Sequence, residues 1–279
     1  TLLNDERIQF IVDHNIGVSV SMDGDQETHD AWRPFKDGRG SYQQISQNVK
    51  KLLAKKTRKP IAARVTLTKD FPDVRKTLEH LLGLGFHEVG FAPVTETDEI
   101  LLLSRPELMK LLDQFEDLAH EFVDQAREDK YLGFSNLSNL LAELHEGQTK
   151  PYGCGAGLGF MAVSPSGDLY LCHRFNEDKE VHLGNIFDGI DRKAQQKLLN
   201  ELHISLKTTC SRCPLKHSCA GGCYFEARER MGEITSPNLH YCQWMLRWTK
   251  IGLEAYVRIM KENPTFMDRL VGTKECQTN

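Results

Sequence analysis

Hydrophobic and polar residues alternate along the first hundred residues in a pattern that predicts helices and strands in turn. Apolar residues at helical spacing indicate helices at about 4–14, 41–55 and 73–82. Runs rich in β-branched and other apolar residues predict strands at about 17–22, 61–68 and 88–94. This alternation is typical of βα units that share a parallel sheet. The sequence therefore predicts an α/β fold in this part of the chain.

The next stretch predicts helices. Ser104-Arg-Pro-Glu107 has the pattern of a capping box with proline in the first turn, and it begins a long amphipathic helix that we interpret as scaffold. A shorter helix is expected near 136–145. Residues 160–172 then predict a hairpin with its turn at Pro165-Ser-Gly167, and a last helix is expected at roughly 239–262. We expect three parts, at 1–149, 150–262 and 263–279, the last a peripheral tail.

Composition excludes several classes of function. The 279 residues are 40% hydrophobic and 27% charged, which is ordinary for a soluble globular protein. A net charge of −4 gives no reason to expect a nucleic-acid or membrane partner. No apolar run is long enough to span a membrane and no secretory signal opens the chain, so we expect a cytoplasmic protein.

The first residues fit the middle of a domain. The chain begins at Thr1, without methionine, directly on a helical pattern. Three βα units cannot close a barrel. We therefore expect a fragment of a longer protein whose N-terminal elements are not in this sequence.

Seven of the eight cysteines form one spaced array in the second half of the chain, and the first 153 residues contain none. The spacing is C-x12-G-x4-C, then C-x2-C-x5-C-x3-C, then a final C. The residues are Cys154, Gly167, Cys172, Cys210, Cys213, Cys219, Cys223 and Cys242. Close cysteine pairs in such a protein favour a reducing compartment and metal binding over disulfides.

Two kinds of metal centre are compatible with this array. A structural zinc site would use four ligands, for which Cys210, Cys213, Cys219 and Cys242 suffice. The other three thiols would then need His173, His217 or Cys276 as a fourth ligand. The glycines packed around the cysteines favour iron–sulfur clusters modestly, because such clusters need close backbone approach.

The order and spacing of the seven cysteines resemble the SPASM domain of radical S-adenosylmethionine (SAM) enzymes. The first half agrees independently. Ser21-Met-Asp23-Gly24, His29-Asp30 with Arg33, and residues 38–42 resemble the fourth strand and following loop of the radical SAM barrel in these maturases. Phe91-Ala-Pro-Val94 resembles the sixth strand. The resemblance covers the chain to about residue 250.

The resemblance implies the C-terminal part of a partial (β/α)6 radical SAM barrel, followed by a small SPASM domain with two auxiliary [4Fe–4S] clusters. Cys210, Cys213, Cys219 and Cys242 would bind the outer cluster, and Cys154, Cys172 and Cys223 the inner one. The inner set has only three assured ligands, with Cys276 as a candidate fourth. The CxxxCxxC that holds the third, catalytic [4Fe–4S] cluster has no match, so we expect this chain alone to be inactive.

Other candidate residues carry alternative interpretations. Ser21 and Asp23 end a strand at the edge where α/β sheets bind ligands, and with the resemblance both are candidates to bind SAM. The alternative is a simple Asp-Gly bend. Arg64 could meet the carboxylate of SAM or form a structural salt bridge. His29 and Asp30 are an acid–base pair or, as we favour, order the loop.

His173 directly follows Cys172, where formylglycine-generating relatives have an aspartate base. We name it as a catalytic candidate; a hydrogen bond to the cluster is the alternative. The resemblance implies an oxidoreductase that modifies a peptide or small protein and takes electrons from a flavodoxin or ferredoxin.

We predict thioether cross-linking of a substrate cysteine. The stretches Tyr152-Gly-Cys-Gly-Ala-Gly-Leu-Gly159 and Leu171-Cys-His-Arg-Phe175 resemble the quinohemoprotein amine dehydrogenase maturation protein. That resemblance implies an amine dehydrogenase small subunit as a candidate substrate. Formylglycine generation, another SPASM maturase activity and a non-catalytic zinc-binding module are the alternatives.

Overall fold

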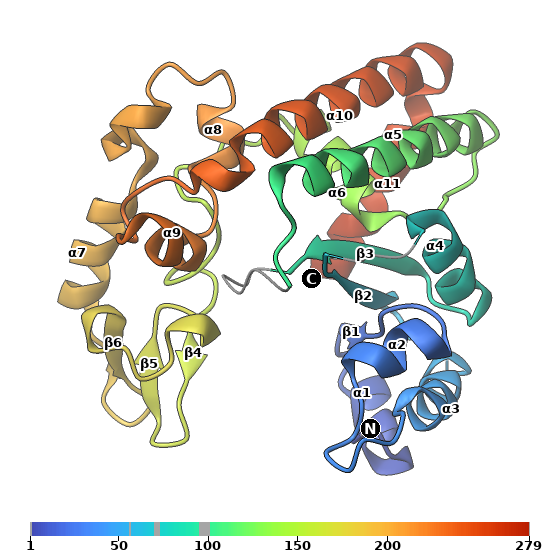
Figure 1. Ribbon diagram of the computed structural model, residues 1–279, viewed down its shortest axis with the longest axis horizontal. Coiled ribbons are helices and arrows are strands. Elements are labelled where there is room, and N and C mark those ends of the chain that lie inside the picture. The colour runs from blue at the N-terminus through green and yellow to red at the C-terminus, as the bar shows by residue number, and fades with distance from the viewer. Residues whose placement is uncertain (1, 56, 70–72, 95–100, 279) are drawn as a thin grey trace. The chain divides into compact units, whose positions relative to one another are not determined.

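The computed structural model describes residues 2–55, 57–69, 73–94 and 101–278, with side chains up to residue 272 (Figure 1). The chain folds as two compact units. The sheet unit comprises residues 1–147 and 247–279, and the cysteine unit comprises residues 148–246. The predicted break near 149 lies close to this first boundary. The second boundary falls inside a helix that begins in one unit and continues in the other.

Within its described residues, the sheet unit contains three parallel strands in the order β1-β2-β3. These are β1 (Val18–Ser21), β2 (Ile61–Leu67) and β3 (Glu88–Pro93). The helices between and before them are α1 (Asp5–Asp13), α2 (Gln26–Trp32), α3 (Tyr42–Leu53) and α4 (Val74–Gly83). The predicted α/β class is confirmed, and α2 is the one element here that the pattern does not predict. The partial barrel stays a prediction.

The two faces of this sheet differ because side chains alternate along each strand. One face of β2 and β3 carries buried apolar side chains, namely Ile61, Ala63, Val65, Leu67, Val89 and Phe91. Ser21, Arg64 and Gly90 are directly aligned across β1, β2 and β3, on the other face. Ser21 and Arg64 are exposed there. The sheet thus presents small and polar side chains opposite its apolar core.

Helices form the rest of the sheet unit. They are α5 (Arg105–Arg127), α6 (Ser135–His145), α10 (Cys242–Glu262) from residue 247 onward, and α11 (Pro264–Thr278). The predicted capping box is present, since Ser104 and Glu107 exchange hydrogen bonds at the start of α5. Phe115 of α5 packs edge-on against Phe134 and Trp248, with ring centroids 5.1 and 5.4 Å away. These aromatic rings join α5, α6 and α10.

The prediction of a peripheral tail is wrong. Residues 264–278 form α11, in which Met267 is fully buried and Phe266 packs edge-on against Phe122. The last part of α10 also belongs to the sheet unit and not to the cysteine region, because Arg247 pairs with Asp113 of α5. Neither contact has a local sequence signal, because each depends on residues more than 130 positions away.

We predict that Met267→Ala lowers the free energy of unfolding by about 2–5 kcal/mol, because it leaves a cavity in a packed interior. Met231→Ala is the control, since that methionine is 43% exposed. Urea denaturation followed by circular dichroism measures both. Equal, small effects would show that α11 contributes little to the core.

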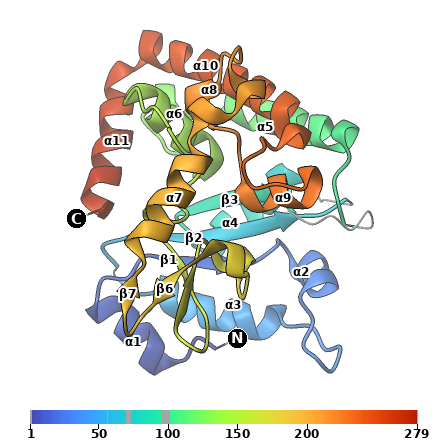
Figure 2. The same cartoon turned by 90° about the vertical axis from the view of Figure 1, so that its left-hand side faces the viewer.

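The cysteine unit is built on a four-stranded antiparallel sheet in sequential order. Its strands are β4 (Ala162–Val163), β5 (Asp168–Tyr170), β6 (His182–Asn185) and β7 (Gly189–Ile190). The predicted hairpin is confirmed as β4 and β5, in which Ala162 pairs with Tyr170. Helix α7 (Arg192–Leu202) lies beside β6 in both views (Figures 1 and 2).

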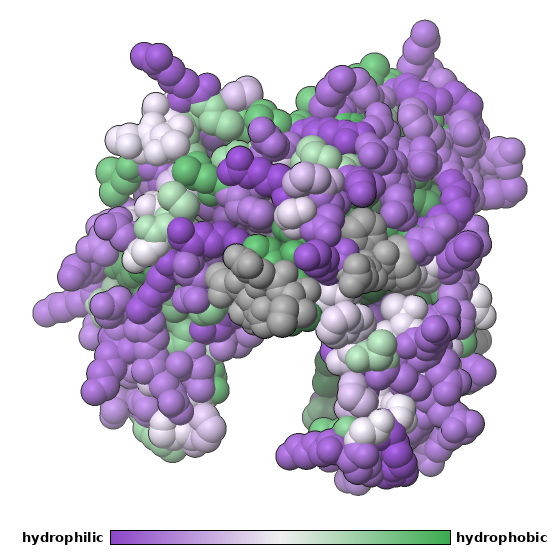
Figure 3. Space-filling model, viewed as in Figure 1, coloured by the Kyte–Doolittle hydropathy of each residue, from purple (hydrophilic) through white to green (hydrophobic). Residues whose placement is uncertain are grey.

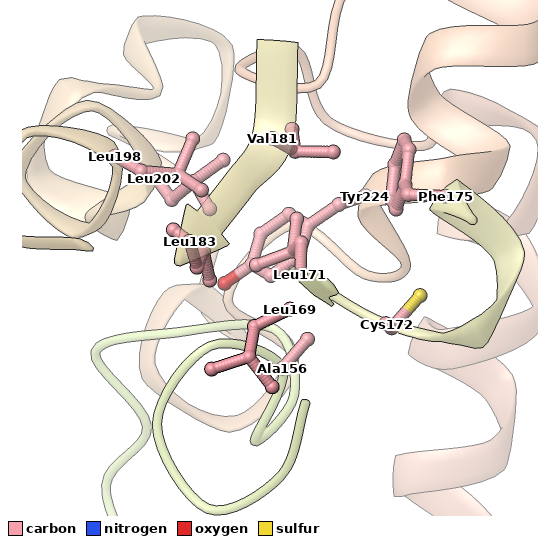
Figure 4. Close-up of a cluster of buried hydrophobic side chains, with 10 residues drawn as sticks. All are labelled: Ala156, Leu169, Leu171, Cys172, Phe175, Val181, Leu183, Leu198, Leu202 and Tyr224. Carbon is pink, nitrogen blue, oxygen red and sulfur yellow. The ribbon is translucent and has the colours of Figure 1, made fainter. Parts of the chain in front are cut away.

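Short helices complete this unit. They are η1 (His173–Phe175), η2 (Lys179–Val181), η3 (Ile204–Leu206), η4 (Thr208–Cys210), α8 (Lys216–Cys219), α9 (Tyr224–Met231) and η5 (Leu239–Tyr241). Leu171, Leu183, Leu202 and Tyr224 form the centre of a small apolar core, and Cys172 belongs to the same cluster (Figure 4). The core therefore positions one of the seven cysteines directly.

The molecular surface is mostly hydrophilic on the face drawn in Figure 3, with hydrophobic residues in small groups. Within the described part of the chain, no helix has both the length and the apolar character needed to cross a membrane.

Candidate functional site

Two glycines bring the first cysteine of the array beside a later one. A Cβ atom placed on Gly153 would lie 2.1 Å from the carbonyl oxygen of Gly222, so the two backbones are in direct contact. The backbone N–H of Gly153 also donates to the Tyr224 hydroxyl, over 3.0 Å. Cys154 and Cys223 directly follow these two glycines. The close backbone contact therefore fixes the separation of the two thiols.

Cys172 reaches the same place from the sheet. It follows β5 and begins η1, where its carbonyl accepts from Phe175 N–H over 3.0 Å. Burial raises the pKa of the Cys172 thiol, the backbone N–H of Arg174 lowers it, and the charge of Cys223 raises it. Burial also raises the pKa of Cys154; the backbone N–H of Ala156 lowers it, and the charges of Cys223 and Cys172 raise it. We call Cys154, Cys172 and Cys223 the inner thiol group.

Three other thiols interact with one another. Cys210 ends η4, Cys213 N–H donates to its carbonyl over 3.0 Å, and Cys219 ends α8. Burial raises the pKa of Cys210, and the charges of Cys219 and Cys213 raise it further. Burial likewise raises the pKa of Cys219, and the hydrogen bond from the backbone N–H of Gly221 lowers it. We call Cys210, Cys213 and Cys219 the outer thiol group.

A left-handed turn separates the two groups. Ala220, Gly221 and Gly222 have φ angles of 49°, 85° and 78°, a run that L side chains adopt only with strain. The turn reverses the chain between Cys219 and the start of α9, so neighbouring cysteines in the sequence belong to different groups. This is the physical reason for the two glycines before Cys223.

Asn238 connects the last cysteine to this turn. Its backbone N–H donates to Gly221 O over 2.9 Å, and its carbonyl lies 3.9 Å from Cys242 Sγ. Its side-chain amide donates to the buried Glu226 carboxylate over 2.5 Å. Cys242, which begins α10, is thereby held to the segment that carries Cys219 and Cys223. The sequence does not predict Asn238 or Glu226 as site residues, because neither has a recognisable motif.

The candidate SAM residues lie on the polar face of the other sheet. Ser21 and Arg64 are direct neighbours across β1 and β2, and both are exposed. A Cβ on Gly90 would lie 3.5 Å from Arg64 Nη1, so the missing side chain leaves room for the guanidinium. Ser21 also lines an open groove of about 1010 Å³ between α1, β1 and α3. No described carboxylate pairs with Arg64, and it is free to meet an anion.

Asp23 has partners within the protein. Its carboxylate is buried and accepts from Arg33 Nε over 2.5 Å and from Thr66 N–H over 2.9 Å. Arg33 also donates to the Thr66 hydroxyl over 3.3 Å. Asp23 thus connects the end of β1 to Thr66 near the end of β2. A direct cofactor contact by Asp23 stays a prediction.

His29 and Asp30 order the loop, the interpretation that the sequence favours. His29 is fully buried; its Nδ1 accepts from Asp23 N–H at 3.3 Å and its Nε2 lies 3.1 Å from Ser41 Oγ. The Ser41 hydroxyl donates to Arg33 O over 2.6 Å, and Asp30 accepts from Tyr42 N–H over 2.7 Å. Because Nδ1 accepts a hydrogen bond here and therefore carries no proton, this network requires a neutral imidazole.

No protein-family model matches the chain. It is 27% identical over 272 residues to a serine-type anaerobic sulfatase-maturating enzyme of Bacteroides thetaiotaomicron, covering 86% of this chain and 63% of that protein. It is 23% identical over 244 residues to AlbA of Bacillus subtilis, an antilisterial bacteriocin subtilosin biosynthesis protein, covering 81% and 49%. The chain therefore spans less than two thirds of either relative.

Solved structures of a similar fold include two of anSMEcpe. Polyhistidine-tagged anSMEcpe with bound AdoMet superposes with a TM-score of 0.79 at 18% identity, covering all of this chain and 74% of that one. Native anSMEcpe with bound AdoMet and Kp18Cys peptide gives 0.73 at 18% identity, covering 93% and 73%. The fold is that of anSMEcpe. By name the relatives are a sulfatase-maturating enzyme and a bacteriocin biosynthesis protein, and the solved structures bind AdoMet, which agrees with the predicted resemblance to radical SAM/SPASM maturases. Similarity to the quinohemoprotein amine dehydrogenase maturation protein stays a prediction.

The seven described cysteines are all free, and among the described residues no three His, Cys, Asp or Glu side chains converge on a position for one metal ion. Sets of free thiols are the ligand type of iron–sulfur clusters and also of structural zinc. Which of the two is bound stays a prediction. Backbone N–H groups at Cys154, Cys172 and Cys219 supply the hydrogen bonds that stabilise thiolates.

The remaining candidate ligands gain no support. His173 is exposed in η1 and His217 is exposed in α8. The side chain of Cys276 lies outside the described residues. A catalytic role for His173 therefore stays a prediction.

We predict that His29 makes the protein less stable as the pH falls. Burial lowers the pKa of His29, so the folded protein binds its proton less readily than the unfolded chain. The stability that this residue contributes is complete above its unfolded pKa of about 6.5 and is lost as the pH falls below it. His29→Gln should flatten the decrease in unfolding free energy between about pH 7.5 and 5.5, measured by urea denaturation. The exposed His14→Gln is the matched control, and an unchanged slope in His29→Gln would contradict the prediction.

Proposed function

We propose that this chain is the SAM-contacting and auxiliary-cluster part of a radical SAM maturase that modifies a peptide or small protein. The observation that carries the proposal is the separation of the thiols into an inner and an outer group. These groups are formed from cysteines that interleave along the sequence, as two cluster sites of the SPASM type require. We assign Cys242 to the outer group as its fourth ligand.

The polar face of the parallel sheet supports a SAM-binding role. Arg64 has a guanidinium suited to a carboxylate, and Ser21 beside it offers a hydroxyl. Both are exposed. Ser21 ends β1, at the carboxyl edge where parallel sheets bind ligands, and Arg64 lies beside it at the middle of β2. We propose that Arg64 forms an ion pair with the carboxylate of SAM. Asp23 and His29 maintain the backbone conformation at this edge of the sheet. When bound, the catalytic cluster and SAM supply the radical that removes a substrate hydrogen.

We propose thioether cross-linking as the reaction. The inner group has three thiols among the described residues, so a cluster bound there has one iron without a cysteine from this set. A substrate thiolate is a natural ligand for such an iron. The full protein would be a cytoplasmic oxidoreductase that takes electrons from a flavodoxin or ferredoxin. An amine dehydrogenase small subunit is one candidate substrate.

Similarity to a sulfatase-maturating enzyme favours a second candidate, formylglycine generation. The chain has His173 after Cys172, where that chemistry is expected to use an aspartate. His173 is exposed and carries no acidic group. We therefore place this reaction second.

Mass spectrometry distinguishes the two reactions. The protein, expressed from its complete reading frame and reconstituted with iron and sulfide under anaerobic conditions, is incubated with SAM and cysteine-containing peptides. A thioether removes two hydrogens and one titratable thiol per link, whereas formylglycine leaves an aldehyde that reacts with hydrazides. The Arg64→Met variant should raise the KM for SAM, and Arg58→Met, on another residue of the same unit, is the control.

The same preparation tests the metal. Iron and acid-labile sulfide in equal amounts support the proposal. Colourless protein with stoichiometric zinc and no sulfide would replace it with a zinc-binding module.

A further inference from the structure

Lys207 carries a buried ammonium group beside the outer thiol group. The residue is only 3% exposed, and its Nζ donates to the carbonyl of Ser236 over 2.9 Å. The same nitrogen lies 5.4 Å from the ring centroid of Tyr224. Lysine is rarely buried in this way unless an anion compensates its charge.

The left-handed turn is shaped around this side chain. A Cβ on Gly221 would lie 2.7 Å from Lys207 Cδ and 3.0 Å from both Cε and Nζ. The ammonium therefore passes directly over the backbone that leads from Cys219 to Cys223. Gly221 serves two purposes, since it adopts a positive φ and leaves space for the lysine.

No described carboxylate neutralises this cation. Ser236 O accepts one of the three N–H donors, and no described acidic side chain lies within ion-pair distance of Nζ. Burial lowers the pKa of Lys207. The negative charges of the Cys210 and Cys219 thiolates raise it. The backbone carbonyl of Lys207 also accepts from Cys210 N–H over 2.9 Å, so the lysine belongs to the segment that carries the outer thiol group.

We propose that Lys207 is the internal counter-ion of the outer iron–sulfur cluster and raises its reduction potential. This inference rests on the proposed function, because it requires a cluster on these thiols. A cluster with thiolate ligands is anionic and gains one more negative charge when a low-potential one-electron donor reduces it. A fixed cation stabilises the reduced form more than the oxidised form. Lys207 thereby favours electron transfer into the outer cluster.

The test is a potentiometric titration of the reconstituted full chain, followed by electron paramagnetic resonance of the reduced clusters. Cys210→Ala identifies the outer signal by its loss or change. Lys207→Met keeps the length of the side chain without its charge, and Lys207→Arg keeps the charge. Lys197→Met, at an exposed site on α7, is the control for loss of a lysine elsewhere in the same unit.

We expect Lys207→Met to shift the redox equilibrium of the outer cluster about tenfold toward the oxidised form, a change of about −59 mV in midpoint potential. The arginine and Lys197 variants should stay near the wild-type potential, and the inner signal should not move. An unchanged outer potential in a fully loaded Lys207→Met protein would overturn the inference.

Failure to load the outer cluster is also informative. Loss of the outer cluster in Lys207→Met but not in Lys207→Arg supports the counter-ion role, because arginine keeps the positive charge and methionine does not. Loss in both variants overturns it in favour of a purely steric role. If wild-type protein binds no iron and sulfide, the proposed function fails instead.

Discussion

In the 279-residue chain, replacing Cys210, Cys213 and Cys219 with alanine should reduce bound iron from about eight to about four atoms, as expected when one of two auxiliary [4Fe–4S] clusters is lost. Replacing Cys154, Cys172 and Cys223 should remove the other half. The reason is that each set of thiols interacts electrostatically within itself, across a turn that separates Cys219 from Cys223. Iron and sulfide analysis after anaerobic reconstitution measures both results.

Pairs chosen against this grouping provide the control. Cys213→Ala with Cys172→Ala takes one ligand from each group and should impair both clusters, although the number of thiols removed is the same as for Cys210→Ala with Cys213→Ala. The latter pair should leave the inner cluster intact. Equal spectra from the two double variants would contradict two separate sites. Cys276→Ala tests whether the eighth cysteine contributes a ligand.

Gly153→Ala should lower the free energy of unfolding by about 1–3 kcal/mol and should deplete the inner cluster. The added Cβ would lie 2.1 Å from the carbonyl oxygen of Gly222, and a backbone atom cannot move aside as a side chain can. The segments carrying Cys154 and Cys223 would have to separate. Thermal unfolding of the protein without metal measures the stability, and iron content of the reconstituted protein measures the second effect.

Gly159→Ala is a matched control in the same loop. Its Cβ would lie 3.8 Å from the nearest atom, the carbonyl oxygen of Gly155, which is an ordinary contact, and its φ lies outside the left-handed region. The change in unfolding free energy should stay within about 0.5 kcal/mol. If the two alanine variants had equal stability and equal iron content, the Gly153–Gly222 contact would have no role in positioning the thiols.

Local patterns predict the elements of the sheet unit well, because their causes are local. Asn4 accepts from Arg7 N–H at the start of α1, and Ser104 with Glu107 forms the expected capping box. β2 forms where its run of β-branched and apolar residues predicts a strand, and its buried side chains alternate with partly or fully exposed ones. The hairpin of the cysteine unit is likewise predictable from its turn residues.

Long-range packing is not predictable in the same way. The sequence near α11 has no strong apolar periodicity, and its burial depends on Phe122, far away in the chain. The sequence suggests that Asp23 faces a ligand, but the Arg33 side chain lies within hydrogen-bond distance and pairs with it. The burial of Lys207 also has no sequence signal, because lysine is usually exposed.

The sequence by itself determined the alternation of helices and strands and the number, order and spacing of the thiols. These features follow from residue periodicity and from residue identity. Only the tertiary structure decided which thiols act on one another, because the Gly153–Gly222 contact and the left-handed turn at 220–222 join distant segments and separate adjacent ones. The same folding buried Lys207 beside Cys210 and Cys219, a proximity that depends on a backbone without a side chain at Gly221.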